Sequence, residues 1–352
     1  MRIRSVAASA EPFALARPYT IAFRTVSSVQ IGVVRIATDD GLVGFGTASP
    51  EAHVTGETDA MCAEALTPDA LGWLVGRDAR ALPALVRELE RRAPTTPAAR
   101  AAVDIALHDL LAKRLGVPLV EMLGRAHDAL PTSITIGIKP TGEAVEEAAE
   151  HVGRGFRVLK VKLGKSLEED LERVRALRER FGARVGIRVD ANQGWSPKDA
   201  AAFFERARGL DVELVEQPTA ARDVAAMRAL PEEARRKIAA DESLLVERDA
   251  LDLVAPPRAC GIFNIKLMKC GGIAEALRMI AVARAHGMKI MLGCMIESSV
   301  AITAAAHLSP LVDTADLDGN LLLDADPYVG ATVVAGRIVL PEGPGLGVRP
   351  RA

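Results

Sequence analysis

The 352-residue sequence has few aromatic side chains and almost no net charge. Aromatic residues make up 3% of the chain, so it has little with which to stack nucleic-acid bases or sugar rings. The formal net charge is -2, and Lys and Arg are spread along the chain instead of forming a basic block. We therefore expect no nucleic-acid partner.

The sequence also lacks closely spaced cysteines. Its cysteines, Cys62, Cys260, Cys270 and Cys294, show no C-x-x-C spacing, which argues against a zinc site and against a disulfide framework. We expect these cysteines to be buried, reduced thiols.

Long uncharged apolar runs are absent as well. Spanning a bilayer takes roughly 18 such residues, and charged residues interrupt even the most apolar segments. The first apolar run meets Glu11-Pro12 before it could form the core of a signal peptide. Hydrophobic residues at 49% and charged residues at 26% are typical of a globular protein. We expect a cytoplasmic protein with no membrane partner.

The N-terminal part of the chain is predicted to form an α+β unit. Segments 28–36 and 42–46 are rich in β-branched residues and flank the turn Asp39-Asp40-Gly41, which predicts a hairpin. Further on the pattern becomes helical, and Thr96-Pro97 opens a predicted helix over 98–115 that ends before a glycine.

From about residue 132, short apolar strands alternate with charged, amphipathic helices. The predicted strands are 133–138, 158–163, 185–190, 212–216, 237–241, 262–267, 289–292 and 314–318. A repeat of roughly 25 residues over eight strands indicates a (β/α) barrel. The alternative is a doubly wound open sheet, but Gly41, Gly44 and Gly46 lack the G-x-G-x-x-G spacing of its phosphate-binding loop.

Charged residues end these strands, although strands inside a parallel barrel should be apolar. They are Lys160, Lys162, Asp190, Glu216, Asp241, Lys266, Asp316 and Asp318. Because the strands end at one face of the barrel, we expect these side chains to meet at its mouth. A single carboxylate could instead cap the next helix, and a single lysine could be solvated, but repetition weakens that alternative.

Asp190, Glu216 and Asp241 end three consecutive strands and would repel one another at close range without a cation between them. Carboxylate oxygens suit Mg²⁺ or a similar hard cation. The sequence therefore predicts a metal site.

Lys162 and Lys266 end strands two and six, which lie half a turn apart in an eight-stranded barrel. A substrate carboxylate bound at the metal would place its α-carbon between the two amines, so each could remove or return a proton and the centre would invert. The metal would also stabilise the resulting enediolate. A basic lysine needs a lowered pKa, and we expect Lys160 or the metal to lower it.

Asp316 and Asp318 end strand eight and should face Glu216 across the barrel mouth. A substrate that bridges them would have a carboxylate at one end and a cation at the other, as in a dipeptide with a free α-ammonium group. Alternatively, one of the two aspartates caps a turn before Gly319-Asn320.

The chain resembles the enolase superfamily over nearly its whole length, in the subgroup that contains muconate-lactonising enzymes. The matching residues are Lys160-Val161-Lys162, Asp190-Ala191-Asn192-Gln193-Gly194-Trp195, Glu216-Gln217-Pro218, Asp241-Glu242-Ser243 and Lys266-Leu267-Met268-Lys269-Cys270-Gly271-Gly272. The resemblance implies an α+β capping domain over 1–125, a modified (β/α)₇β barrel over 126–320, and a tail over 321–352 that returns to the cap.

The resemblance also implies a role for each charged residue. Asp190, Glu216 and Asp241 would hold one Mg²⁺ per subunit, and Lys162 and Lys266 would exchange the α-proton of the C-terminal residue of a dipeptide. Lys160 would assist at the substrate carboxylate, and Asp316 and Asp318 would hold the N-terminal ammonium. Cap segments 19–24 and 49–56 would close over the substrate.

In function the chain looks like a dipeptide epimerase of the L-Ala-D/L-Glu kind. Cycloisomerases, o-succinylbenzoate synthases and N-acylamino acid racemases share the scaffold and remain alternatives, as does a binding protein without catalytic activity. The pair Asp316 and Asp318 favours dipeptides, supported by Met295 and Glu297 after strand seven.

The preferred side chains are less clear from the sequence. Arg24 suits an acidic substrate side chain or is structural, whereas Glu51, Asp324 and Asp326 favour cationic side chains, to which we lean; hydrophobic dipeptides stay open. Lys269 is not expected to be catalytic. The sequence leaves the oligomeric state open, and a homo-oligomer is compatible with it.

Overall fold

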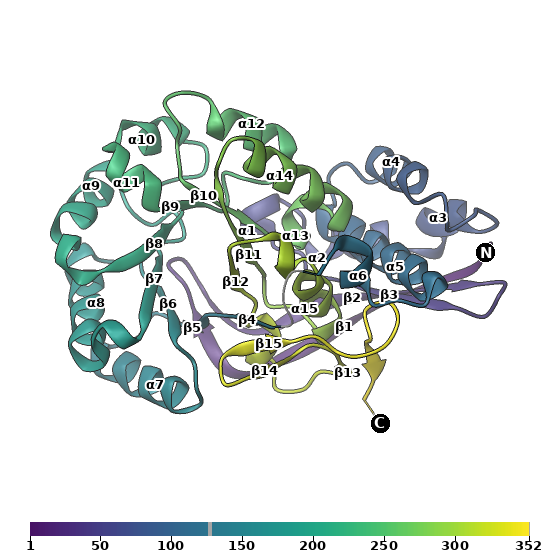
Figure 1. The fold of residues 1–352 in the computed structure, drawn as a ribbon, viewed down its shortest axis with the longest axis horizontal. Coiled ribbons are helices and arrows are strands. Elements are labelled where there is room, and N and C mark those ends of the chain that lie inside the picture. The colour runs from purple at the N-terminus through teal and green to yellow at the C-terminus, as the bar shows by residue number, and fades with distance from the viewer. Residues whose placement is uncertain (126–128, 352) are drawn as a thin grey trace.

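The computed structural model describes residues 1–125 and 129–351. Figure 1 shows a barrel of strands surrounded by helices and, beside it, a long antiparallel sheet with helices of its own. No helix among these described residues is long and apolar enough to cross a membrane.

The cap is built on a three-stranded antiparallel sheet in the order β1-β2-β3. The strands are β1 (Ile3–Thr20), β2 (Thr25–Thr38) and β3 (Val43–Ala48), so the predicted hairpin is confirmed. The cap helices are α1 (Ala52–Thr55), α2 (Asp59–Ala65), α3 (Pro68–Leu71), the 3₁₀ helix η1 (Gly72–Leu74), α4 (Leu82–Arg92), α5 (Pro97–Leu115) and α6 (Leu119–Leu123).

Helix α5 packs closely on β3 because β3 contains two glycines. A Cβ atom at Gly44 would lie 2.2 Å from the carbonyl oxygen of Ala106, and one at Gly46 would lie 1.8 Å from that of Ala102. Only glycine allows this approach. The helix ends at Gly116, whose positive φ of 73° suits a glycine cap, as the sequence predicts.

The barrel contains eight parallel strands in sequential order from β5 to β12. They are β5 (Ile134–Ile136), β6 (Val158–Lys162), β7 (Gly186–Asp190), β8 (Val212–Glu216), β9 (Ile238–Ala240), β10 (Ile262–Ile265), β11 (Lys289–Gly293) and β12 (Thr314–Asp316). A single bridge between Thr132 and Ala315 joins the first and last strands. The predicted barrel is therefore confirmed, and the doubly wound sheet is excluded.

Helices cover the outside of the barrel (Figure 1). They are α7 (Thr141–Gly153), α8 (Leu167–Phe181), η2 (Gly182–Arg184), α9 (Pro197–Arg206), η3 (Arg208–Leu210), α10 (Val224–Ala229), α11 (Glu232–Lys237), α12 (Glu247–Val254), α13 (Leu267–Cys270), α14 (Ile273–Ala285), α15 (Ser299–His307) and η4 (Ser309–Leu311). Among the described residues, the helix that follows β12 is the short 3₁₀ helix η5 (Gly319–Leu322), which gives the (β/α)₇β pattern.

The C-terminal tail packs against the cap. Its strands are β13 (Tyr328–Val329), β14 (Thr332–Val334), β15 (Arg337–Val339) and β16 (Arg349–Pro350), and β15 pairs with β4 (Ala129–Pro131). Gly345 donates to the carbonyl of Val117 at 2.9 Å and accepts from Leu119 at 2.7 Å. These contacts agree with a tail that returns to the cap, while the limits 1–125, 126–320 and 321–352 stay our prediction.

Candidate active site

A cavity of about 310 Å³ lies where the C-terminal ends of the barrel strands face the cap. The barrel supplies Lys160, Lys162 and Lys266, and the cap supplies Arg24 and Glu51. The cavity therefore lies at the face of the barrel where the strand-end charges were predicted to meet.

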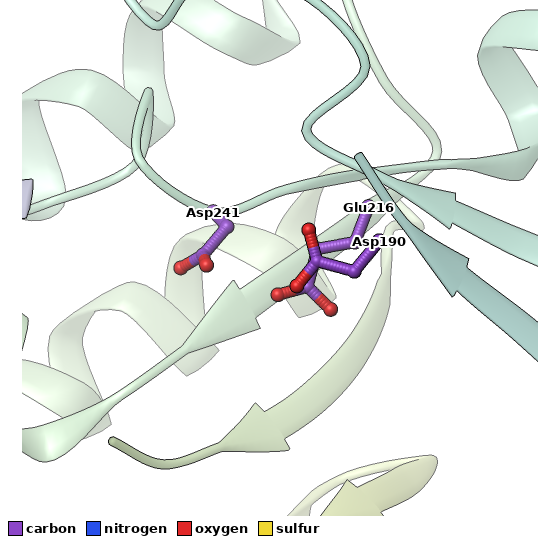
Figure 2. Close-up of side chains that lie close together, drawn as sticks. All are labelled: Asp190, Glu216 and Asp241. Carbon is purple, nitrogen blue, oxygen red and sulfur yellow. The ribbon is translucent and has the colours of Figure 1, made fainter. Parts of the chain in front are cut away.

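Three carboxylates converge beside this cavity (Figure 2). Asp190 and Glu216 end β7 and β8, and Asp241 directly follows β9. Ligand oxygens from the three lie within 4.8 Å of one another, and no side chain of the three is more than 1% exposed. The next helices are capped by other residues, Ser196, Asp223 and Val246, so helix capping does not explain the three carboxylates.

This donor set fits Mg²⁺. Hard cations prefer carboxylate oxygens, and a cation would offset negative charges that are otherwise forced together without water. Burial raises the pKa of Glu216 well above its ordinary value, and the neighbouring carboxylate of Asp190 raises it further. The three carboxylates thus repel one another, and a divalent ion bound between them would relieve this repulsion.

Lys162 and Lys266 approach the carboxylates from different strands. The Nζ atom of Lys162 donates to Oδ2 of Asp190 at 2.6 Å, and that of Lys266 donates to Oδ2 of Asp241 at 2.7 Å. Lys162 ends β6 and Lys266 directly follows β10, four strands further along the sheet. The two amines therefore come from opposite sides of the barrel mouth.

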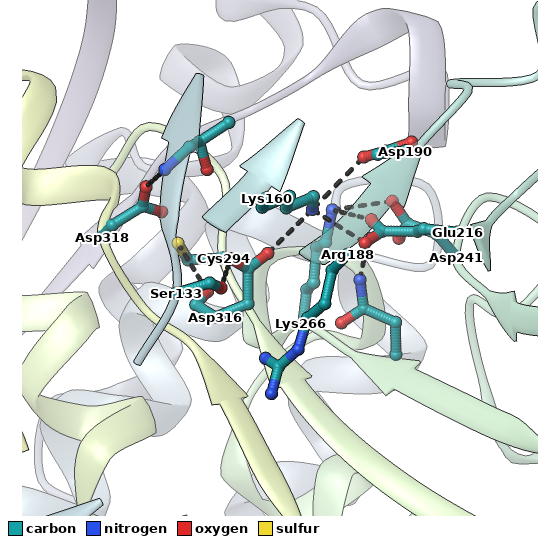
Figure 3. A network of polar contacts seen from close by, with 12 residues as sticks. Ser133, Lys160, Arg188, Asp190, Glu216, Asp241, Lys266, Cys294, Asp316 and Asp318 are labelled. Carbon is teal, nitrogen blue, oxygen red and sulfur yellow. Dashed lines mark hydrogen bonds and ion pairs between the residues drawn. The ribbon is translucent and has the colours of Figure 1, made fainter. Parts of the chain in front are cut away.

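Lys160 lies between the carboxylate triad and Asp316 (Figure 3). Its Nζ atom is 2.7 Å from Oε2 of Glu216, 3.2 Å from Oδ2 of Asp190 and 2.7 Å from Oδ2 of Asp316. Its spacing of two from Lys162 on β6 directs both side chains into the barrel mouth, as predicted.

Lys160 acts on the pKa of Lys266 in the predicted direction, but its charge alone does not bring this pKa below the ordinary value. Burial and Lys160 both lower the pKa of Lys266, but Asp241 and Glu216 outweigh them and raise it above its ordinary value. A divalent cation bound by the same carboxylates would act in the opposite direction, which leaves the metal as the group able to lower this pKa.

Asp316 and Asp318 lie together near the end of β12. Asp316 accepts from Oγ of Ser133 at 2.5 Å and from Lys160 at 2.7 Å, whereas Oδ2 of Asp318 accepts from the backbone N–H of Thr135 at 2.7 Å. Asp318 precedes η5 but makes no side-chain capping bond to it, which argues against the turn-cap alternative. Burial and the neighbouring Asp316 raise the pKa of Asp318 to about 6, so a bound cation would be favourable here.

Two cap segments meet above the cavity. Arg24, between β1 and β2, forms an ion pair with Glu51, which caps α1, and the rings of Phe23 and His53 lie 4.9 Å apart. Arg24 and Glu51 both line the cavity. The sequence did not indicate that these two residues pair with each other.

The remaining predicted residues do not all line the cavity. Met295 lines it, but Glu297 is not among the described residues that do. The carboxylate of Glu297 is buried and accepts from the N–H of Met295 at 2.7 Å. Asp326 accepts from the N–H groups of Ser299 and Tyr328 and so supports the start of α15. Asp324 is exposed. We therefore drop Asp324 and Asp326 from the site.

Lys269 has a positioning role in the structure. Its buried Nζ atom pairs with the carboxylate of Asp241 and donates to the carbonyl oxygens of Asp241 at 2.6 Å and Asn264 at 3.0 Å. These contacts fix a carboxylate of the metal site, in keeping with the expectation that Lys269 is not catalytic.

Several residues that line the cavity had no individual role in the prediction: Tyr19, Asp59, Thr135, Asn192, Glu242 and Cys294. Cys294 directly follows β11, and Thr135 is the middle residue of the short strand β5, so closeness to a strand end was an available signal. Asp59 and Tyr19 belong to the cap, and only the docking of cap on barrel brings them to the site.

Two family models match the chain. Residues 3–124 match the N-terminal domain of the mandelate racemase / muconate lactonizing enzyme family, and residues 143–352 match the enolase C-terminal domain-like family. Together they span both the cap and the barrel.

Individual relatives match over nearly the whole chain. An L-Lys-D/L-Arg epimerase from Methylococcus capsulatus is 52% identical over 352 residues, 99% of each chain. An L-Ala-D/L-Glu epimerase from Clostridium acetobutylicum is 39% identical over 340 residues, 95% of each chain. The crystal structure of the Methylococcus capsulatus dipeptide epimerase with Mg and the dipeptide L-Arg-D-Lys gives a TM-score of 0.97 at 52% identity, covering 99% of each chain. The chain therefore belongs to the mandelate racemase / muconate lactonizing enzyme family of the enolase superfamily.

Proposed function

We propose that the protein is a Mg²⁺-dependent dipeptide epimerase that inverts the α-carbon of the C-terminal residue, with a preference for dipeptides with cationic side chains. The observation that carries this proposal is the pair of buried lysines, Lys162 and Lys266, on opposite sides of a carboxylate triad. The relatives named above, which include an epimerase for cationic dipeptides, support it.

The reaction is a proton exchange between the α-carbon and the two lysines. One lysine, as the neutral amine, takes the α-proton, and the substrate becomes an enediolate. The other lysine, as the ammonium, gives its proton to the opposite face, so no net proton is gained or lost. When bound, Mg²⁺ would supply positive charge for the negative charge that develops on the substrate carboxylate. Lys160 would assist at the same carboxylate.

The dipeptide assignment rests on Asp316 and Asp318. Both side chains are at most 3% exposed and line the cavity on the far side of Lys160 from the triad. Asp316 is already paired with Lys160, so Asp318 is the carboxylate best placed to bind an additional cation, such as the α-ammonium of a dipeptide.

The preference for cationic side chains rests on the cap. Glu51 and Asp59 both line the cavity from the cap side, against Arg24 alone. A cationic substrate side chain would find this excess of negative charge favourable. Arg24 supports the alternative, an epimerase for acidic dipeptides such as L-Ala-L-Glu. Met295, which lines the same cavity, would contact a substrate side chain.

Proton NMR in D₂O with a dipeptide library tests the proposal. We expect loss of the α-proton signal of the C-terminal residue only, most rapidly with Lys and Arg dipeptides such as L-Lys-L-Arg. Exchange from no dipeptide would refute the epimerase function, and tight binding without exchange would support the binding-protein alternative. Fastest exchange from an N-acylated amino acid, or turnover of a substrate without an ammonium group, would favour a racemase, a cycloisomerase or an o-succinylbenzoate synthase.

A cytoplasmic location stays a prediction. The free cysteines of the chain, three of which are buried, fit a reducing compartment.

A further inference from the structure

A second cavity lies directly behind the active-site cavity. It measures about 370 Å³ and lies between the end of β1, the end of β5 and helix α7. Tyr19, Thr135 and Leu322 line both cavities. These three residues therefore form the wall between them, and Tyr19 has the largest side chain of the three.

The wall adjoins the subsite for the substrate ammonium. Thr135 donates its backbone N–H to Oδ2 of Asp318 at 2.7 Å, and Asp318 lines the active-site cavity with Tyr19. Burial raises the pKa of the Tyr19 phenol well above its ordinary value; Lys160 lowers it in part and Asp318 raises it further. The phenol is thus near enough to both charges to respond to them.

Tyr19 is held against the barrel and does not belong to the turn between β1 and β2. It pairs with Val26 in the sheet, and its neighbour Thr20 accepts a hydrogen bond from the N–H of Ile138 at 2.9 Å. A Cβ atom at Gly137 would lie 3.1 Å from the carbonyl oxygen of Thr20 and 3.4 Å from Cδ2 of Tyr19. The absence of a side chain at Gly137 allows this close approach, so the end of β1 packs directly on the barrel.

The second cavity has a polar wall that carries charges of both signs. Three glutamates of α7 line it, of which Glu147 is paired with Lys139 and Glu150 with Arg17. The third, Glu143, has no ion-pair partner among the described residues, and the same holds for Arg154, which also lines the cavity and lies 3.5 Å from Nδ1 of His151. A peptide one residue longer at its N-terminus would move its ammonium by roughly 3.5 Å, which is in the direction of this cavity if the C-terminal end stays at the metal site.

We propose that Tyr19 restricts the substrate to two residues by closing the active-site cavity behind the ammonium subsite, and that the second cavity receives the extra N-terminal residue once this wall is opened. The inference rests on the proposed dipeptide function, because it takes the position of the ammonium from Asp316 and Asp318.

The test compares α-proton exchange from L-Lys-L-Arg and Gly-L-Lys-L-Arg by proton NMR in D₂O. Wild-type protein and Tyr19→Phe, which keeps the ring, should exchange the dipeptide and leave the tripeptide almost untouched. Tyr19→Ala should raise kcat/KM for the tripeptide at least about 10-fold, because the steric exclusion is removed. Tyr19→Leu and Leu322→Ala, which remove less of the wall, are assayed in the same way. Circular dichroism checks that each variant folds.

The outcomes separate this inference from the proposed function. Absence of dipeptide exchange in the wild type would refute the dipeptide function itself. With dipeptide exchange present, the inference fails if wild type exchanges the tripeptide equally well, or if no variant that keeps dipeptide activity gains tripeptide exchange. It also fails if all three wall-opening variants fold but lose the dipeptide activity, because the wall would then be needed for the dipeptide itself.

Discussion

At the residue scale, the lysines of the site differ in the contacts that their amines make. Lys269 has three oxygen acceptors and no access to solvent, whereas Lys162 and Lys266 each donate one hydrogen bond to a carboxylate of the triad and line the cavity. A cation that binds the triad would compete for the same carboxylates and free the two amines. We expect position, and not residue type, to decide which lysine is catalytic.

Replacing Lys266 by methionine should abolish inversion while leaving the fold intact. Loss of a general acid or base costs about 10² to 10⁴ in rate, and here no product epimer can form without the second lysine. Slow deuterium exchange of one stereoisomer through Lys162 should survive. Chiral chromatography and NMR in D₂O measure the two processes separately, and epimerisation at wild-type rate would contradict a role for Lys266.

Asp318→Asn should weaken substrate binding more than turnover. Removing one charge-assisted contact to an ammonium costs about 2 kcal/mol, so we expect KM for a dipeptide to rise roughly 10- to 100-fold with a smaller change in kcat. Ser133→Ala, which removes a neutral partner of Asp316, is the matched control and should have a weaker effect. An unchanged KM in Asp318→Asn would show that the ammonium binds elsewhere.

The sequence predicted the charged residues of the site because a charge at the end of an apolar strand has no role in packing. It assigned no individual role to Tyr19 or Thr135, because neutral residues at such positions are ordinary. It included Glu297, whose side chain the loop after β11 turns away from the cavity towards the N–H of Met295. Sequence spacing does not determine the direction of a side chain in an irregular loop.

At the element scale, strands with strong apolar patterns were predicted and the irregular ones were not. No separate strand was predicted for β1, whose pattern Pro12 and Pro18 interrupt. It tolerates these prolines as an edge strand that pairs with β2 alone in its sheet. The pairing of β4 with β15 joins residues about 200 positions apart, and no local pattern encodes it.

The contact between β3 and α5 leads to a stability prediction. Gly46→Ala would place a methyl group 1.8 Å from the carbonyl oxygen of Ala102. We expect a loss of about 3 kcal/mol or more, visible as a melting temperature lower by at least about 4 °C. Gly142→Ala in α7, where a Cβ atom meets nothing within 4 Å, is the matched control and should be neutral or stabilising. Equal effects of the two substitutions would refute the packing argument.

The free energy of unfolding should depend on pH because His307 of α15 is buried as a neutral ring. This buried imidazole accepts from the N–H of Val120 at 3.1 Å and has Nε2 3.1 Å from the carbonyl oxygen of Leu346, so it joins α6, α15 and the tail as a neutral ring. Burial lowers its pKa to about 4. The unfolded chain therefore takes up a proton at a higher pH than the folded chain does.

The contribution of His307 is fully present above its ordinary pKa of about 6.5 and is lost as the pH falls towards 4, by up to about 3 kcal/mol. Denaturation of the wild type and of His307→Gln between pH 4 and 7 measures this contribution to the free energy of unfolding. The variant should show a flatter pH dependence over this range, and identical curves would contradict the assignment.

At the scale of the whole molecule, the site exists only because the cap and the barrel dock. The barrel supplies the triad and the lysines, and the cap supplies Tyr19, Arg24 and Glu51 to the same cavity. The barrel could be predicted from its repeating strand pattern, whereas the cap's share of the cavity depends on contacts between distant segments, such as Thr47 Oγ1 with Ser298 Oγ at 2.9 Å. On the proposed function, we therefore expect the barrel to supply the chemistry and the interface with the cap to supply much of the substrate selectivity.

The central claim is that two lysines act from opposite faces of one α-carbon, and the isotope content of the first product molecules tests it most directly. The reaction of L-Lys-L-Arg in D₂O is sampled at early times, and each epimer is analysed by mass spectrometry. Two opposed bases predict that the new epimer contains solvent deuterium at its α-carbon from the first turnovers, while the remaining substrate is still largely protonated. A product epimer that keeps the substrate's own α-proton would mean that a single base serves both faces, and would contradict the proposal.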